Sequence, residues 1–191
     1  MVSPLITILT AGIAGGAGLP LEQGTVSQCD LALQVTKEVT SHDYGKPVVF
    51  NVSDPTDTYL EAAALAKGWT ELGADKTVDV PPPPAPLVAD FASGIRNAVS
   101  RCRTVRKWLI KHKIRYGKAA VDSIVARIVD DELPAGIFTV SLPTISRDGQ
   151  TALVYTSDTW GGEAGGGFAH LYRRQDDGTW KSVSVRRLWI S

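Results

Sequence analysis

ALVYTSDTWGGEAGGGFAHLY, residues 152–172, lies at the centre of the segment that decides the fold, Ile137 to Ser191. Side chains alternate along the runs on both sides of its glycines, as they do in half-buried strands. The turn signals Asp148-Gly149 and Asp176-Asp177-Gly178 frame it, and Asp-Gly between alternating runs is a strong hairpin signal. The segment therefore predicts an antiparallel meander in which residues 160–167 form a long glycine-rich loop. Its strands are expected near 137–145, 151–158, 167–174 and 179–190.

The chain before this meander predicts mostly helices. Leu31, Val35 and Val39 recur every four residues, which predicts a helix over roughly 26–39. Pro47 to Val52 alternates and predicts a short strand, and Thr58 opens a capping box for a helix that Gly68 ends. A further helix is expected over 119–129. The expected fold class is α+β, one domain over residues 19–191, with N-terminal and central helices packed on a C-terminal four-stranded antiparallel meander.

Two neighbouring segments in the middle of the chain predict different structures, a stiff spacer and then a helix. The run Pro81-Pro82-Pro83-Pro84-Ala85-Pro86 predicts a stiff spacer that excludes helix, since proline has no backbone N–H and pushes the preceding residue into extended geometry. Beyond it, a continuous helix with one buried apolar face is expected, because its apolar residues step by three or four positions. Those residues are Phe91, Ile95, Ala98, Cys102, Val105 and Leu109.

The N-terminus suggests export. No charged side chain precedes Glu22, and the apolar run from Pro4 to Leu19 ends in small residues, Ala14 to Gly18. This pattern predicts a signal peptide over residues 1–18 and a periplasmic or extracellular protein. A buried first strand or helix is the alternative, because no Lys or Arg follows Met1. The run is too short and too rich in glycine to predict a membrane span.

Cys29 and Cys102 are the only two cysteines. In an exported protein an even number of cysteines predicts a disulfide, here a single bridge between these two. Two reduced, buried thiols are the alternative. Because no His or second Cys lies near either cysteine, no metal site is expected.

Charge is segregated along a chain whose formal net charge is zero. Residues 91–121 hold nine bases and no acid, whereas residues 22–90 hold eleven acids and four bases. The stretch Arg96 to Lys118, interleaved with Trp108, His112 and Tyr116, therefore supports a polyanion-binding hypothesis. We expect the acids at 130–132 to pair with this stretch and weaken such binding, so that nucleic acid is not the favoured partner.

Catalytic motifs for metalloproteases, serine hydrolases, phosphate-binding loops and dinucleotide-binding folds are absent from the sequence. A small hydrolase that uses His170 with Asp158 or Glu163 as its orienting carboxylate is one hypothesis. Its alternative is an ordinary histidine in a half-buried strand. No cofactor is expected.

A non-catalytic binding or accessory module is the favoured hypothesis. Aromatic side chains offer flat contact surfaces, and a glycine-rich loop offers a shape that adjusts to a small ligand or a protein partner. The alternative is that these aromatics form the core of the meander. The candidate ligand-binding residues are Trp160, Gly161, Gly162, Gly165, Gly166, Gly167, Phe168 and Tyr172.

The C-terminal fifty residues also resemble those of a group of uncharacterised bacterial exported proteins. The resemblance rests on Pro143 to Gly149, Ala152 to Tyr155, the glycine run, Leu171 to Arg174 with Asp177-Gly178-x-Trp180-Lys181, and the final Trp189-Ile190-Ser191. It implies export and a helix-plus-meander domain. It implies no catalytic residue.

Overall fold

A computed structural model describes residues 25–55, 65–71, 79–130, 132–161 and 164–191 of the chain. The signal-peptide prediction for residues 1–18 lies outside these ranges, and so does most of the helix expected from Thr58.

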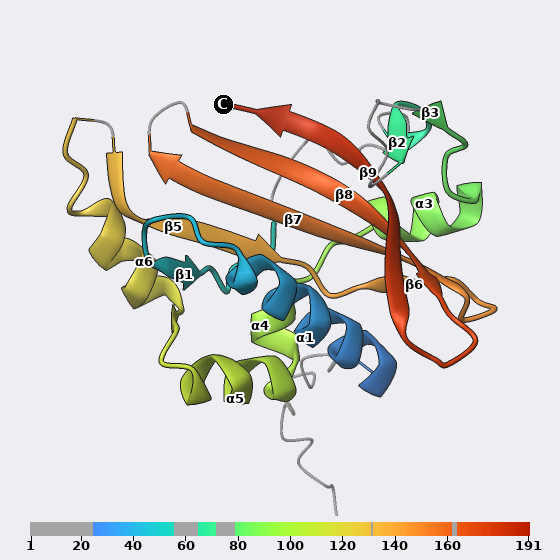
Figure 1. The fold of residues 1–191 in the computed structure, drawn as a ribbon, viewed down its shortest axis with the longest axis horizontal. Helices are drawn as coiled ribbons and strands as arrows, with labels where there is room; N and C mark the ends of the chain where they lie inside the picture. The colour runs from blue at the N-terminus through green and yellow to red at the C-terminus, as the bar shows by residue number, and fades with distance from the viewer. Residues whose placement is uncertain (1–24, 56–64, 72–78, 131, 162–163) are drawn as a thin grey trace, which may run out of the picture.

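One large mixed sheet organises the described part of the chain (Figure 1). Its centre is antiparallel and follows chain order: β5 (Glu132–Val140), β7 (Thr151–Gly161), β8 (Ala164–Arg174) and β9 (Trp180–Ile190). β7, β8 and β9 agree with the predicted meander, since long alternating runs beside Asp-Gly turns form hairpins, but the strand expected near 137–145 is wrong as a single strand, because β5 ends at Val140. The two-residue strand β6 (Thr144–Ile145) adds to β7 outside this order.

The sheet extends beyond four strands at both edges, so the expected four-stranded meander is wrong as a description of the whole sheet. Next to β9 lie β2 (Trp69–Glu71) and then β3 (Asp79–Val80), both antiparallel. Next to β5 lie β1 (Val48–Phe50) and then β4 (Arg115–Tyr116), and β1 runs parallel to both of its neighbours. β1 confirms the short strand expected over Pro47 to Val52, whereas β2, β3 and β4 are only two or three residues long and were not expected.

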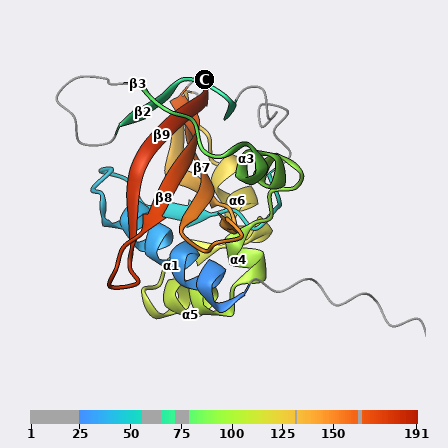
Figure 2. The same cartoon turned by 90° about the vertical axis from the view of Figure 1, so that its right-hand side faces the viewer.

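Helices cover both faces of the sheet (Figures 1 and 2). Ala152 and Val154 of β7 pack toward α1 (Val26–Ser41), α4 (Ala98–Arg101) and α5 (Arg103–Lys111). The intervening Leu153 and Tyr155 pack toward α3 (Ala85–Ala92) and Trp69 on the opposite face. A smaller core joins α6 (Lys118–Val125) to β1 and β5. Both faces of β7 are therefore buried, which is why apolar side chains occur at successive positions along it.

The continuous helix expected from Phe91 to Leu109 is wrong. All six apolar residues that predicted it, the stripe Phe91, Ile95, Ala98, Cys102, Val105 and Leu109, are nevertheless buried. The segment forms three helices, α3, α4 and α5. Asn97 adopts extended geometry and begins α4 by accepting hydrogen bonds from the backbone N–H groups of Val99 and Ser100. Cys102, also extended with φ −107° and ψ 109°, separates α4 from α5. Periodicity predicted the buried face because short helices in succession preserve it, but it did not reveal the breaks.

The proline run also differs from expectation at its end. Helix α3 begins at Ala85, with Pro84 as its N-cap and Pro86 inside its first turn. A proline is tolerated there because the first N–H groups of a helix have no partner within it. The expectation that this run excludes helix is therefore wrong for residues 85–86.

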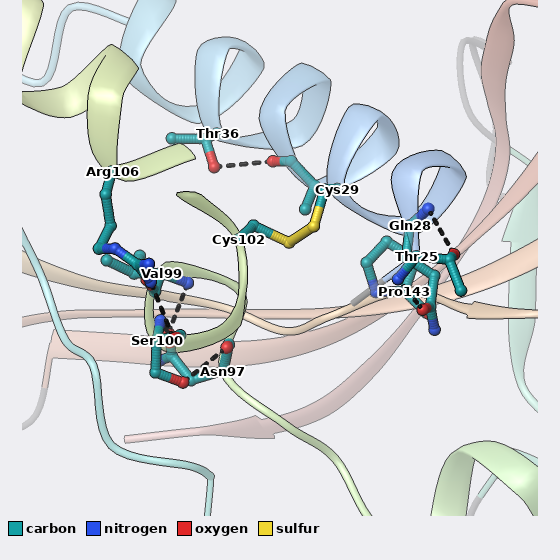
Figure 3. The surroundings of a disulfide bond; sticks show 11 residues. Thr25, Gln28, Cys29, Thr36, Asn97, Val99, Ser100, Cys102, Arg106 and Pro143 are labelled. Atoms are coloured by element: carbon teal, nitrogen blue, oxygen red, sulfur yellow. Dashed lines mark hydrogen bonds between the residues drawn. A yellow bond between two sulfur atoms is a disulfide. The ribbon is translucent and has the colours of Figure 1, made fainter. Parts of the chain in front are cut away.

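The predicted disulfide between Cys29 and Cys102 is confirmed (Figure 3). It joins the first turn of α1 to the junction between α4 and α5, with 5.4 Å between the two α-carbons. The bridge closes a loop of 73 residues, and removing that much freedom from the unfolded chain stabilises the fold by about 4 kcal/mol. Gln28 next to it donates a 2.8 Å hydrogen bond to the carbonyl oxygen of Pro143, which ties α1 to the end of the sheet.

Within the described ranges, the structure contains no helix long and apolar enough to cross a membrane.

Candidate functional site

The glycine-rich loop expected at 160–167 is wrong, because most of it is sheet. Strand β7 continues to Gly161 and β8 begins at Ala164. Gly165, Gly166 and Gly167 pair with Thr159, Asp158 and Ser157 across the hairpin. Gly162 and Glu163, predicted ligand-binding and catalytic residues, lie outside the described ranges.

The absence of a side chain at these glycines allows neighbouring groups to pack closely. It does not make an adaptable loop. A Cβ at Gly167 would lie 2.0 Å from Nε1 of Trp189, whose indole covers that position, and a Cβ at Gly165 would lie 2.6 Å from the carbonyl oxygen of Asp158. Glycine in a strand often marks such a close approach. The sequence run alone did not distinguish this role from a loop, because both require the absence of a side chain.

A cleft lies between α1 and the sheet face that α1 covers. Its volume is about 470 Å³, within the range of small-molecule sites. Residues from α1 and the segment after it form one wall, and residues from β5, β7, β8 and β9 form the other. The lining residues are Val35, Glu38, Val39, His42, Tyr44, Phe138, Thr156, Ser157, Asp158, Phe168, His170, Tyr172, Ser182 and Val185.

Strand alternation places the sheet residues of the cleft. Phe168, His170 and Tyr172 are every second residue of β8, so their side chains share a face. Thr156 and Asp158 do the same on β7, where Thr156 is directly opposite Phe168. The cleft therefore contains four of the sequence-predicted residues, Phe168, Tyr172, His170 and Asp158.

His170 is a neutral polar group in the middle of this wall. Its Nε2 lies 2.9 Å from Oγ1 of Thr156, within hydrogen-bonding distance, and its ring lies between those of Phe168 and Tyr172, with centroid distances of 6.3 and 6.5 Å. Burial lowers the pKa of His170 to about 4, because a charged imidazole loses its hydration there. The side chain is therefore uncharged at neutral pH.

No hydrogen bond between His170 and Asp158 occurs in the described part of the chain, although both line the same cleft. Asp158 instead accepts from the indole N–H of Trp160 at its Oδ2 atom. The pairing that the hydrolase hypothesis requires, a carboxylate that orients the imidazole, is thus not present between these two residues.

Glu38 on α1 connects the two walls. Its Oε2 accepts a 2.9 Å hydrogen bond from the hydroxyl group of Tyr172, and its Oε1 accepts a 2.7 Å bond from Nε2 of Gln34. Burial, and secondarily the charge of Glu38, raises the pKa of Tyr172 well above its usual value, so the phenol keeps its proton.

Trp160 lies beside the cleft rather than in its lining. Its ring is 4.9 Å from that of Tyr44 and 5.4 Å from that of Phe138, in an edge-to-face arrangement with Phe138. Tyr44 is itself 5.2 Å from Phe138, and burial, followed by the charge of Asp158, raises the pKa of Tyr44. Trp160 and Tyr44 thus lie near Asp158, and Tyr44 and Phe138 line the cleft with it.

Sequence reasoning missed the wall that α1 and residues 42–44 supply, which includes Glu38, Val39 and Tyr44. Helical periodicity identified Val35 and Val39 as apolar positions, but nothing local indicates that part of this face is left uncovered by the sheet. Whether the sheet covers this face depends on how α1 is placed against the strands, which only the tertiary structure shows.

The basic stretch is less neutralised than expected. Arg101 pairs with Asp54, and Lys118 with Asp122, but Glu132 pairs with Lys46 instead of the basic stretch. The expected pairing between the acids at 130–132 and this stretch is therefore wrong for Glu132, and Asp131 lies outside the described ranges. Within those ranges the exposed Arg103, Lys107 and Lys111 of α5 form no ion pair.

Comparison of this chain with family models, with curated proteins and with solved structures finds no match.

Proposed function

We propose that the protein binds a small, largely apolar ligand in the cleft between α1 and the sheet, as a non-catalytic binding or accessory module. The observation that carries the proposal is a cleft of about 470 Å³ whose exposed surface is mainly apolar, although polar residues alternate with aromatic and aliphatic ones in its lining. Small-molecule sites have this composition, because apolar burial supplies affinity and a few polar groups supply orientation.

The pre-formed walls support this proposal. The disulfide joins α1 to the α4–α5 junction, and the Glu38–Tyr172 hydrogen bond joins α1 to β8. A helix held at both of these points keeps its distance from the sheet when the cleft is empty. Binding then costs little ordering of the protein, which favours affinity.

The hydrolase alternative receives less support. A general base works best with a pKa near the operating pH, whereas that of His170 is about 4. The Nε2 atom of His170 contacts a threonine hydroxyl, but Asp158 does not orient the imidazole. The arrangement suits recognition through a neutral hydrogen-bonding group better than proton transfer.

Blocking the cleft tests the binding proposal. N-phenyl-1-naphthylamine, a neutral probe that fluoresces in apolar sites, is titrated into the wild-type protein and into Val39→Trp, which places an indole in the cleft. We expect Val39→Trp to weaken probe binding at least about tenfold, or 1.4 kcal/mol. Val26→Trp, at a position on the same helix that is 79% exposed, is the matched control and should bind as wild type does. Unchanged affinity in a folded Val39→Trp variant would overturn the proposal.

Export is part of this proposal. The Cys29–Cys102 disulfide supports it, since such bonds persist mainly in oxidising compartments. Mass spectrometry of the protein from its native host tests it. Cleavage near residues 14–18 and location outside the cytoplasm are expected, and an intact Met1 on a cytoplasmic protein would contradict it.

Polyanion binding through α5 is a second candidate function. The exposed, unpaired Arg103, Lys107 and Lys111 favour it, because charges that are not neutralised within the fold remain available to phosphate groups. Against it, the ring of Trp108 is stacked on His112 at 4.2 Å and is thus partly occupied as a stacking surface.

A further inference from the structure

Charge in the cleft has one sign. Its acids are Glu38 and Asp158, and among the described residues that line it there is no Lys or Arg. Its histidines are His170, which is neutral at pH 7, and the exposed His42, whose Nδ1 lies 2.9 Å from the carbonyl oxygen of Glu38. A cleft lined by one sign of charge and by low-dielectric walls focuses its field on a ligand of the opposite sign.

The two carboxylates are not equivalent. Both oxygens of Glu38 accept hydrogen bonds, from Gln34 and from Tyr172, so that side chain is committed to holding α1 against β8. Asp158 accepts at Oδ2 from Trp160, and its Oδ1 has no hydrogen-bond partner within the described ranges. The oxygen available to a ligand is therefore on Asp158.

Aromatic rings lie near this carboxylate: Trp160 donates to it, and its charge acts on Tyr44. Trp160, Tyr44 and Phe138 contact one another with centroid distances of 4.9 to 5.4 Å, and Tyr44 and Phe138 line the cleft together with Asp158. The faces of aromatic rings attract cations, most strongly when water is excluded. A carboxylate beside such rings favours an ammonium group over a neutral or anionic one.

We infer that the ligand is an apolar amine or quaternary ammonium compound, with its cationic head at Asp158 and the rings of Tyr44 and Phe138 that line the cleft. Its hydrocarbon part occupies the remainder of the cleft, against Val39, Phe168 and Val185. This inference rests on the proposed function, since it names the chemical class of the ligand for the same cleft. The side chains of Thr156 and His170 offer neutral hydrogen-bonding groups on the sheet wall of the cleft.

Three probes with one hydrocarbon chain and different heads test the inference: octylamine, 1-octanol and octanoate. At pH 7 the first is a cation and the last an anion. Isothermal titration calorimetry should show octylamine binding at least about tenfold more tightly than 1-octanol, because hydrogen bonds to charged groups are worth more than neutral ones, and octanoate binding more weakly than either.

The Asp158→Asn variant removes the negative charge of this side chain and keeps its size, so it tests whether the charge causes the preference for octylamine. We expect this variant to lose most of the preference for octylamine while its affinity for 1-octanol stays within about twofold, because Asn keeps the size and an acceptor for Trp160. Asp90→Asn removes an exposed carboxylate on α3, outside the cleft lining, and is the matched control that should keep the preference.

The outcomes are distinguishable. If 1-octanol binds and octylamine binds no more tightly, or if Asp158→Asn keeps the full preference, the inference is overturned and the proposed cleft function stands. If none of the three probes binds and the naphthylamine probe does not bind either, the proposed function fails and this inference fails with it.

Discussion

The indole ring of Trp160 lies directly over the α-carbon of Gly136, where an added Cβ would come within 2.5 Å of the ring carbons. The glycine belongs to β5 and the tryptophan to the neighbouring β7. The close approach holds the indole against Tyr44 and Phe138 and leaves its N–H directed at Asp158. One missing side chain thus positions the carboxylate end of the cleft.

Gly136→Ala should therefore destabilise the fold by about 1–3 kcal/mol, the usual cost of overpacking, because Tyr44 and Phe138 restrict where the indole can move. Denaturant unfolding measures the change. Gly94→Ala is the control, since a Cβ there would meet nothing closer than 3.6 Å, and its effect should stay within about 0.5 kcal/mol. Adding Trp160→Leu to Gly136→Ala should recover part of the loss if the ring is the cause. A Gly136→Ala variant as stable as wild type would show that the contact is readily relaxed.

His170 should make stability depend on pH in a defined window. Its pKa is lowered from the usual 6.5 to about 4 in the folded state, so the unfolded chain binds a proton more readily than the folded one. The free energy of unfolding should then fall as the pH drops from about 6.5 to about 4, by up to about 3 kcal/mol. Above pH 6.5 both states are neutral at this side chain and the effect vanishes.

His170→Phe should flatten this part of the pH profile, measured by urea unfolding at a series of pH values. His42→Gln, which changes an exposed ring, is the control. Hydrogen bonds also lower the pKa values of Asp148, Asp177 and Glu132, and the stability that these carboxylates contribute is lost below about pH 5. They contribute equally to wild type and to His170→Phe, so the difference between the two profiles reports His170. Parallel profiles for wild type and His170→Phe would contradict the burial of a neutral imidazole.

Breaking the Cys29–Cys102 bridge should lower the free energy of unfolding by about 4 kcal/mol. Its loop of 73 residues is long, so the reduced unfolded chain gains considerable freedom. The Cys29→Ala, Cys102→Ala double variant and the reduced wild-type protein should show similar losses in denaturant unfolding. A reductant that leaves the wild-type midpoint unchanged would indicate that the bridge is absent from the protein in solution.

Helix α5 should bind single-stranded DNA weakly and with strong salt dependence, because its exposed cations lack partners in the described part of the chain. The Arg103→Glu, Lys107→Glu variant should reduce binding at 50 mM salt at least about tenfold. The control, Arg173→Glu with Lys181→Glu, reverses two exposed charges on paired positions of β8 and β9. Fluorescence anisotropy with a labelled oligonucleotide measures both. Equal losses in the two variants would attribute binding to net charge rather than to α5.

Local patterns determined the central strands, the first helix and the disulfide. Asp-Gly turns and alternation define β7, β8 and β9, because backbone geometry at a turn depends on the residues in the turn itself. The cysteines form the bridge that their number predicted in an oxidising compartment, although Cys102 lies between two helices and not on a helix face. The stripe from Phe91 to Leu109 predicted which side chains are buried even where the helix is broken.

Only the tertiary structure decided the parallel pairing of β1, the role of the glycines and the composition of the cleft. Strand pairing between β1 and β5 joins residues more than eighty positions apart, and no local preference encodes such a contact. The run Gly165 to Gly167 pairs with neighbouring strands, and position 167 requires glycine because Trp189, from another strand, occupies the space that a side chain there would need. Asp158 and Glu38 face one cleft because α1 lies across β7 and β8, a placement that depends on packing between distant segments rather than on either sequence alone.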